Sequence, residues 1–270
     1  MEQPDYSIAQ VRQRVIINAT VTAKEQLSEL MIRLTFASPD FIGLEAISCA
    51  DTYMKLILPA SDGSEGQVMR SYSVRSHDSV AGVVDIDFAL HGQGGVAAAW
   101  AASVAVGSPA LFKGVGGGYT PHAQAPWHLL IGDDSALPAI AVALERISEA
   151  TPATVVLVGA TAETLFGAHQ DRLLGLNSGK AVELVVLDSA DDVTELVRAA
   201  YAAHEGTPHV FLHGEAAMVR QARRVLLSEF ALPKSALSAS GYWRRGNTDE
   251  QWRESKREWN EAIAQEDSAA

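Results

Sequence analysis

The chain contains very little cysteine. Cys49 is the single cysteine among 270 residues, so the chain by itself cannot form an internal disulfide, ligate an iron–sulfur cluster or build a Cys-rich zinc site. The eight histidines are scattered, and His209 and His213 lie on a predicted strand, where four residues span about 13 Å. We therefore expect no protein-bound metal site, and a reducing, cytoplasmic setting fits the cysteine content.

Basic residues are also few. The 21 lysines and arginines face 33 aspartates and glutamates, which leaves a formal charge of -12. Such a charge repels a nucleic-acid backbone and an anionic membrane surface unless cations gather locally. General nucleic-acid binding is therefore excluded as the expected function.

Long hydrophobic runs are missing as well. The most apolar stretch, residues 96–106, is much shorter than the roughly 20 residues that span a bilayer. Residues 1–10 include two acidic residues and no apolar core, whereas an export signal needs a basic start followed by a hydrophobic run. We expect neither a signal peptide nor insertion into a membrane.

Residues 8–118 show the alternation of apolar and polar residues that predicts antiparallel strands. In VVDIDFAL, Val84, Ile86 and Phe88 fall on one face, and Asp85 and Asp87 fall on the other. About six such segments with turn signals between them predict a small closed or nearly closed barrel. They are residues 15–21, 31–36, 52–58, 71–76, 83–90 and 108–113.

Residues 125–240 show a different pattern, in which continuous hydrophobic runs alternate with helical segments. This pattern predicts a parallel sheet covered on both faces, with ligands expected beyond the carboxyl ends of its strands. The predicted strands are residues 128–132, 154–160, 182–188 and 209–214, and the predicted helices are 138–150, 191–204 and 215–229.

We place the domain boundary at the glycine run Gly116 to Gly118, which a simple flexible connection would also explain. Residues 241–270 form a C-terminal extension, expected near the ligand pocket, with a helix from about Thr248. Trp252 and Trp259 share one helical face with Lys256, so a solvated helix docked by two tryptophans is an alternative interpretation of this segment.

The segment RSYSVR (70–75) combines residue types that a flavin dinucleotide requires. Tyr72 offers an aromatic surface for the ring, Ser73 a hydrogen-bond partner at ring N5, and Arg70 a cation for the pyrophosphate. Taken alone, the segment favours an ordinary strand that has a packed tyrosine and an exposed arginine.

HGQGGVAAAWAA (91–102) follows a predicted strand and places glycines before small helix formers. The exposed N–H groups at such a helix start allow a phosphate to approach closely. Gly94, Gly95, Val96, Ala97 and Ala98 form the expected pyrophosphate cradle. The alternative is a glycine-rich turn followed by a helix packed closely on the barrel.

GDDSALPAIA (132–141) occupies the position of a dinucleotide-binding turn but lacks the Gly-x-Gly-x-x-Gly spacing. Asp133 and Asp134 would repel a phosphate, and helix capping is another role for them. A nicotinamide nucleotide would therefore have to use other turns, at 159–164 or 214–217. Ser135 lacks the flanking glycines of a hydrolase nucleophile elbow.

With these motifs in view, nearly the whole chain resembles the siderophore-interacting protein family of ferric-siderophore reductases. RSYSVR is similar to the Arg-x-Tyr-Ser/Thr flavin motif of the superfamily, and residues 87–101 to the stretch that holds the FAD pyrophosphate. GDDSALPAIA and GYWRRG (241–246) are similar to the two most specific signatures of the family.

The resemblance implies a ferredoxin-reductase-like architecture. It consists of an N-terminal antiparallel six-stranded FAD-binding β-barrel, a Rossmann-like parallel α/β domain for NAD(P)H, and a C-terminal helical extension. It also implies that Arg70, Tyr72 and Ser73 contact FAD, with His91 and residues 94–98 beside the dinucleotide. Lys55 is implied as a basic residue of the siderophore pocket, and Arg244 and Arg245 are candidate partners for it.

The implied activity is electron transfer from NAD(P)H, or from reduced ferredoxin, through FAD to an Fe(III)-siderophore. No protein residue is expected to act as a covalent catalyst or iron ligand. Two alternatives remain open at this point: a general flavin or ferredoxin-type reductase of the same architecture, and a siderophore-binding protein without turnover.

Overall fold

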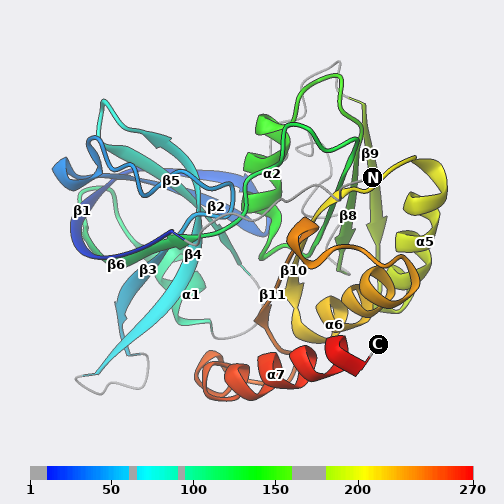
Figure 1. The fold of residues 1–270 in the computed structure, drawn as a ribbon. Coiled ribbons are helices and arrows are strands. Elements are labelled where there is room, and N and C mark those ends of the chain that lie inside the picture. Colours follow the sequence, from blue (N-terminus) through cyan, green and yellow to red (C-terminus); the bar gives the residue numbers. More distant parts are fainter. Residues whose placement is uncertain (1–10, 61–65, 91–94, 160–180, 270) are drawn as a thin grey trace.

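The computed structural model describes residues 11–60, 66–90, 95–159 and 181–269. The chain forms a β-barrel and a parallel α/β sheet that lie side by side, and a long C-terminal helix runs beneath both (Figure 1). This arrangement confirms the expected fold class.

The six predicted amino-terminal strands all form, and they close into an antiparallel barrel in the order β1-β2-β5-β4-β3-β6. Alternate side chains such as Met54, Leu56 and Leu58 point into the core, as the period-two pattern requires. The strands are β1 (Val11–Ser28), β2 (Met31–Ala37), β3 (Tyr53–Pro59), β4 (Gln67–Asp78), β5 (Val83–Ala89) and β6 (Pro109–Gly117).

Aromatic side chains fill the barrel. Phe36 meets Phe112 edge to face with 5.0 Å between ring centroids, and Trp100 stacks on Phe36 at 6.4 Å. Trp100 belongs to α1 (Val96–Ser103), so this short alanine-rich helix packs against the barrel core.

The second lobe is a five-stranded parallel sheet in the order β11-β10-β7-β8-β9. Its strands are β7 (His128–Gly132), β8 (Ala153–Val158), β9 (Val182–Leu187), β10 (His209–Glu215) and β11 (Leu237–Trp243). The sequence analysis predicts four of these strands and misses β11, which crosses the expected division at residue 240.

Helices cover both faces of this sheet. On the barrel side, α2 (Leu137–Arg146) packs on alternate residues such as Leu130 and Phe211. On the other side, α5 (Val193–Ala203) and α6 (Ala216–Arg224, continued by a π-helical turn at 225–229) pack on Ile131 and Leu212. A parallel sheet buried on both faces explains the continuous hydrophobic runs of its strands.

The glycine run is part of the folded structure. Gly116 and Gly117 end β6, and a Cβ on Gly116 would lie only 2.7 Å from the Tyr53 ring. Asp51 Oδ1 then accepts hydrogen bonds from the backbone N–H groups of Gly118 and Tyr119, both at 2.8 Å. The simple flexible connection is therefore wrong: glycine is needed here for close packing.

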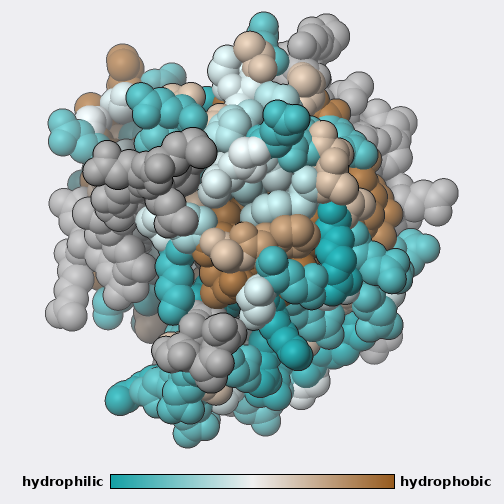
Figure 2. Space-filling view, turned by 45° about the vertical axis from the view of Figure 1, so that its right-hand side comes forward, coloured by the Kyte–Doolittle hydropathy of each residue, from teal (hydrophilic) through white to brown (hydrophobic). Residues whose placement is uncertain are grey.

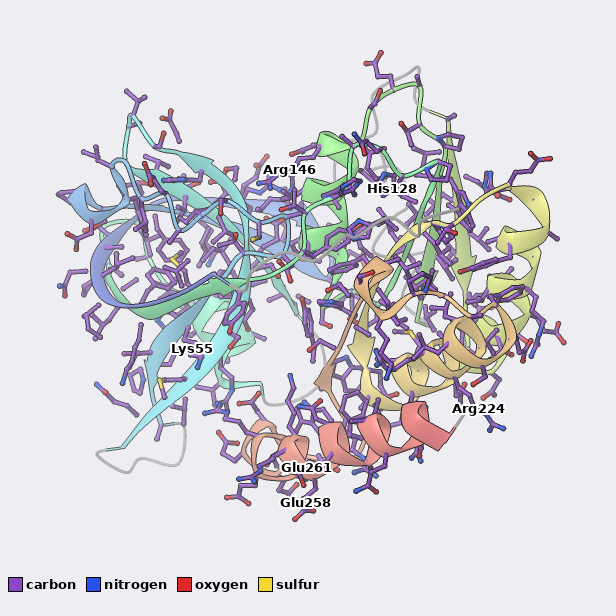
Figure 3. All side chains as sticks on the ribbon, in the orientation of Figure 1. Lys55, His128, Arg146, Arg224, Glu258 and Glu261 are labelled. Atoms are coloured by element: carbon purple, nitrogen blue, oxygen red, sulfur yellow. The ribbon has the colours of Figure 1, made fainter. Side chains whose placement is uncertain are left out.

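Helix α2 also joins the two lobes. Arg75 on β4 forms a salt bridge with Glu145 at 2.5 Å, and Arg146 Nη1 donates to the backbone oxygen of Ser48 at 2.5 Å (Figure 3). These contacts connect one end of α2 to two segments of the barrel.

The C-terminal helix α7 (Asp249–Ala269) begins where the sequence predicts it. Thr248 Oγ1 accepts from Gln251 N–H, and Gln251 Oε1 accepts from Thr248 N–H, which is a capping box. Trp252 is buried against Gly241 of β11, and its ring meets Trp259 at 5.4 Å. The lower surface of the molecule, where α7 lies, is mostly hydrophilic (Figure 2). The buried tryptophan and the hydrophilic outer surface together confirm a solvated helix docked by tryptophans.

No helix among the described residues combines the length and the apolar character needed to cross a bilayer.

Candidate functional site: the cleft between barrel and sheet

A cleft of about 1470 Å³ lies between the barrel, the carboxyl ends of the sheet strands and α7. Sites for one small molecule usually occupy about 300–1,000 Å³. The cleft therefore has room for a dinucleotide together with part of a second molecule. It lies where the sequence analysis expects a ligand, beyond the carboxyl ends of the parallel strands.

The RSYSVR segment forms the middle of β4 and brings all three expected flavin contacts, Arg70, Tyr72 and Ser73, to this cleft. The Tyr72 ring packs against Phe88 with 4.3 Å between centroids. Burial raises the pKa of Tyr72 to about 12, so its hydroxyl stays protonated. An aromatic ring that packs against another ring and also borders a cleft is suited to contact a flavin ring.

Arg70 has partners that the sequence analysis does not anticipate. Its guanidinium forms salt bridges with Asp249 at 3.2 Å and Glu250 at 2.8 Å, both at the start of α7. Arg253 of α7 also donates to the backbone oxygen of Met69 at 2.7 Å. The acidic first turn of α7 is therefore fastened to β4, and the cation expected to meet the pyrophosphate is shared with two carboxylates.

The expected pyrophosphate cradle lies at the start of α1. Gly95 is the N-cap, where no side chain caps the helix, so the N–H groups of Val96, Ala97 and Ala98 have no intrahelical acceptor. These amides fit an anionic group. Residues 95–98 are not among those lining the cleft, and His91 and Gly94 lie outside the described residues.

Of the expected substrate cations, Lys55 and Arg245 line the cleft, whereas Arg244 is exposed and does not. Lys55 is an outward-facing residue of β3 (Figure 3). The backbone N–H of Arg245 donates to Glu215 Oε1 at 3.1 Å, which ties the GYWRRG segment to the end of β10.

Lys256 of α7 is a cleft residue to which the sequence analysis assigns no ligand role. Its Nζ donates to Ser240 Oγ at 3.4 Å, and among the described residues it forms no salt bridge. Burial lowers the pKa of Lys256. The sequence did contain a signal for this role, because Lys256 shares one helical face with Trp252 and Trp259. The face that docks the helix also borders the cleft.

A hydrogen-bonded row lies at the edge of the cleft in the sheet lobe. The Tyr242 hydroxyl lies 2.8 Å from Nδ1 of His213. Nε2 of His213 lies 2.9 Å from Ser238 Oγ. Both ring nitrogens of His213 are thereby engaged.

Asp133 lies in the turn between β7 and α2, the place in the chain where the sequence analysis considers a dinucleotide-binding turn. Oδ1 accepts from the N–H and hydroxyl of Ser135, and Oδ2 accepts from Glu215 N–H at 2.7 Å and Trp243 Nε1 at 2.8 Å. Burial, followed by the charge of Asp134, raises the pKa of Asp133 to about 6. The carboxylate orders the loop ends around it, and α2 itself has Ala136 as N-cap, without a side-chain cap.

Glu215 caps the helix that begins at the turn 214–217. Its Oε2 accepts from Ala217 N–H at 2.6 Å and from Met218 N–H at 3.0 Å. These two amides are therefore occupied, and the binding of a nicotinamide phosphate at this turn stays a prediction. Gly159 of the other suggested turn lines the cleft, and residues 160–164 lie outside the described residues.

No group of three or more potential metal ligands occurs in the part of the chain that the structure describes. His209 and His213 are engaged elsewhere: His209 Nδ1 accepts from His122 N–H at 3.2 Å, and His213 bonds to Tyr242 and Ser238.

Comparisons with known proteins address the same two lobes. A family model described as "Siderophore-interacting FAD-binding domain" matches residues 60–119, and one described as "Siderophore-interacting protein" matches residues 125–246. An uncharacterized protein of Mycobacterium tuberculosis (strain H37Rv) is 33% identical, covering 90% of this chain and 95% of its own length.

Ferric vibriobactin reductase of Vibrio cholerae is 26% identical, covering 86% of this chain and 91% of that protein. Among solved structures, the siderophore-interacting protein SipS of Aeromonas hydrophila superposes with a TM-score of 0.73 at 24% identity, covering 92% of this chain and 99% of that one. A ferredoxin reductase in carbazole 1,9a-dioxygenase superposes with a TM-score of 0.65 at 16% identity, covering 84% and 69%. These structures share the fold with this chain.

Proposed function

This chain belongs to the siderophore-interacting protein family, and from that premise we propose that it is an FAD-dependent ferric-siderophore reductase. The observation that carries the proposal is the cleft itself, where Arg70, Tyr72 and Ser73 share one space with Lys55 and Lys256. The barrel side of the cleft has the residue types that suit a flavin and also Lys55, whose strand pairs with β4, and α7 adds Lys256. The cations that suit an anionic iron chelate therefore border the same space as the flavin residues.

FAD, when bound, supplies the two-electron and one-electron chemistry that joins a hydride donor to Fe(III). The described residues fit this cofactor. A tyrosine ring packed on Phe88 and a serine hydroxyl line the cleft, and the start of α1, outside the cleft lining, has amides without an intrahelical acceptor. In the proposal Tyr72 supports the ring, Ser73 hydrogen-bonds at N5, and the amides of residues 96–98, with Gly94, Gly95 and His91, hold the pyrophosphate.

The cations of the cleft give the proposed substrate a place to dock. A ferric tris-catecholate is strongly anionic, so a protein with a net charge of -12 needs local cations to receive it. Lys55 and Arg245 fill this role in the proposal, with Lys256 added from the structure. Arg244, exposed beside the cleft, is at most a contact at its rim.

Iron release follows from coordination chemistry. Siderophore oxygens hold Fe(III), a hard cation, far more tightly than Fe(II), so reduction lets iron leave without any protein ligand. The proposed setting is the cytoplasm, with NAD(P)H or reduced ferredoxin as donor. The capped turn at 214–217 supports a donor that does not place its phosphates there.

The test uses purified protein reconstituted with FAD under anaerobic conditions. We expect a yellow protein that NADH, NADPH or reduced ferredoxin bleaches, and that a ferric siderophore reoxidises with Fe(II) trapped by a chromogenic chelator. Protein that binds ferric siderophore but cannot be loaded with FAD would instead be a carrier. Reduction without reoxidation by any ferric siderophore would favour a general flavin or ferredoxin-type reductase.

Two variants separate the parts of the site. Tyr72→Ala should weaken FAD retention, and a variant that stays fully yellow would contradict the stacking role. Lys55→Glu should raise the KM for an anionic ferric siderophore at low salt and leave FAD content unchanged. Unchanged turnover at low salt would show that Lys55 does not dock the substrate.

A further inference from the structure

Trp243 at the end of β11 differs in its location from the other large apolar side chains of the surface. Within the described residues, the exposed large hydrophobic side chains are Ile16, Ile42, Val80, Val106, Val186 and Trp243. Single apolar side chains on an outer surface are ordinary and need no explanation. Trp243 is the one member of this group that lines the cleft, and 39% of its surface is exposed.

A buried carboxylate holds the Trp243 ring. The indole Nε1 donates to Asp133 Oδ2 at 2.8 Å, and the same oxygen accepts from Glu215 N–H at 2.7 Å. Hydrogen bonds to an ionised acceptor are stronger than those between neutral groups. Asp133 is only 5% exposed, so a group of the protein interior fixes one edge of a ring that also borders the cleft.

This hydrogen bond joins the two motifs that are most specific for the family. Asp133 belongs to GDDSALPAIA and Trp243 to GYWRRG, and the two residues are 110 positions apart. The register between β10 and β11 also shifts just before Trp243, which leaves Tyr242 without a counterpart on β10. Irregularities of this kind re-aim side chains next to active sites. The two motifs together hold an indole ring at the cleft.

Cations border the cleft close to Trp243 along the chain. Arg245 lies two residues after it, and Lys256 donates to Ser240 Oγ, three residues before it, at 3.4 Å. Positive charge attracts an anionic chelate, but it does not distinguish that chelate from another of the same charge. One aromatic contact adds a preference for rings, worth about two- to tenfold in affinity.

A catecholate chelate of Fe(III) matches both features of this part of the cleft. Its negative oxygens surround the metal, and its aromatic rings project outward beyond those oxygens. The oxygens can therefore face Lys256 and Arg245 while a ring meets the indole. An aliphatic hydroxamate or carboxylate chelate has no aromatic ring for this contact.

We propose that Trp243 is a specificity-determining residue that contacts an aromatic ring of the bound iron chelate, with Asp133 as its positioning residue. The contact favours catecholate siderophores over chelates of equal charge that lack rings. This inference rests on the proposed function, because it assigns a substrate class to the same cleft.

The test measures the binding of gallium(III) chelates to the FAD-loaded protein. Ga(III) has the charge and nearly the size of Fe(III) but is not reduced, so binding is separated from turnover. A hexadentate tris-catecholate and a tris-oxalate of gallium carry the same charge, and only the first has aromatic rings. Equilibrium dialysis, with gallium measured by mass spectrometry, gives the Kd of each chelate.

Two variants separate the ring from its hydrogen bond. Trp243→Leu and Trp243→Phe both lose the N–H that Asp133 accepts, but only Trp243→Leu loses the aromatic ring. Trp243→Leu should raise the Kd of the catecholate about fivefold and leave the Kd of the oxalate unchanged. Trp243→Phe should keep the Kd of the catecholate within about twofold of the wild-type value. Ile42→Ala trims an exposed apolar side chain outside the cleft and should change neither Kd.

Three results would overturn the ring contact. They are unchanged catecholate binding in Trp243→Leu, equal weakening of catecholate and oxalate binding in that variant, and equal weakening of catecholate binding in Trp243→Phe and Trp243→Leu. The flavin and the nicotinamide are the other planar rings of the proposed reaction. A loss confined to the affinity for FAD or NAD(P)H would assign the indole to one of these rings and would also overturn the proposal.

Failure of this inference differs from failure of the proposed function. Wild-type protein that reduces a ferric siderophore keeps the reductase proposal, whichever of those results is found for Trp243. Catecholate binding that depends on Trp243, without reduction of the ferric chelate by any donor, overturns the reductase proposal alone. Wild-type protein that binds neither gallium chelate overturns both.

Discussion

Arg70 on barrel strand β4 is held by Glu250 in the first turn of α7, with 2.8 Å between Nη2 and Oε1. The pair joins the two parts of the chain between which the cleft opens. It also places a carboxylate on the cation that the proposed FAD pyrophosphate would approach. The start of α7 therefore lines the cleft, and its carboxylates compete with the proposed FAD pyrophosphate for Arg70.

The first prediction concerns this competition. In the double variant Asp249→Asn, Glu250→Gln, we expect FAD to bind about three- to tenfold more tightly, since the variant removes both ion pairs of Arg70 and each surface ion pair is worth up to about 1 kcal/mol. Fluorescence quenching during titration of the FAD-free protein measures the Kd.

The control for this prediction makes the same charge change elsewhere on α7. Glu258→Gln, Glu261→Gln alters the outer side of the helix (Figure 3) and should leave the Kd unchanged. Weaker FAD binding in the Asp249, Glu250 variant would show that the pairs serve to build the cleft.

The second prediction concerns Asp133, whose four hydrogen bonds join three separate segments. Asp133→Asn should lower the free energy of unfolding at pH 7 by about 2–4 kcal/mol, because an amide cannot accept all four bonds and leaves buried donors unpaired. Urea denaturation measures the change. A loss below 0.5 kcal/mol would show that the loop ends rearrange freely.

The third prediction concerns the pH dependence of that loss. The pKa of Asp133 is raised to about 6 by burial, above the ordinary aspartate value, so the folded protein binds a proton there more tightly than the unfolded chain does. The stabilisation from this proton is complete below pH 4 and disappears as pH rises through 6. The destabilisation by Asp133→Asn should therefore shrink between pH 4 and pH 6.5. A cost that grows over this window would mean that the carboxyl pKa is lowered.

The fourth prediction concerns the docking of α7. A Cβ on Gly241 would lie 2.9 Å from the Trp252 ring and 3.2 Å from the Trp259 ring, so Gly241→Val should displace the helix. We expect red-shifted tryptophan emission and faster proteolysis within α7. Ala262→Val adds comparable bulk at an exposed position of the helix and should change neither. If α7 is cleaved by protease equally slowly in both variants, β11 has shifted to accommodate the added side chain.

The fifth prediction concerns Lys256. With an anionic ferric tris-catecholate, Lys256→Gln should raise the KM about fivefold at low salt, an effect that added salt weakens. With an uncharged ferric hydroxamate it should change little. Because burial lowers the pKa of Lys256, the wild-type KM should begin to rise at a lower pH than an ordinary lysine would cause. Lys113→Gln, on β6 and outside the cleft, is the control. Equal KM increases for both substrates would assign Lys256 a structural role.

Local periodicity was sufficient to predict most of the fold. The alternation in VVDIDFAL is typical of a strand with one buried face, and the unbroken apolar run in HLLIG is typical of a strand with two. Both patterns can be recognised within a few residues. The missed strand β11, LSASGYW, shows neither pattern. Its small residues allow α6 and α7 to pack closely, and its pairing with β10 makes it a strand.

The sequence by itself determined the two lobes, the start of α7 at its capping box, and the residue types at β4 that suit a flavin, because these depend on neighbours along the chain. Only the tertiary structure decided that Arg245 and Lys256 border the cleft while Arg244 does not, that Asp133 binds Glu215 and Trp243, and that His213 bonds to Tyr242 and Ser238. Those contacts join residues many positions apart, and their geometry depends on how the lobes and α7 pack together.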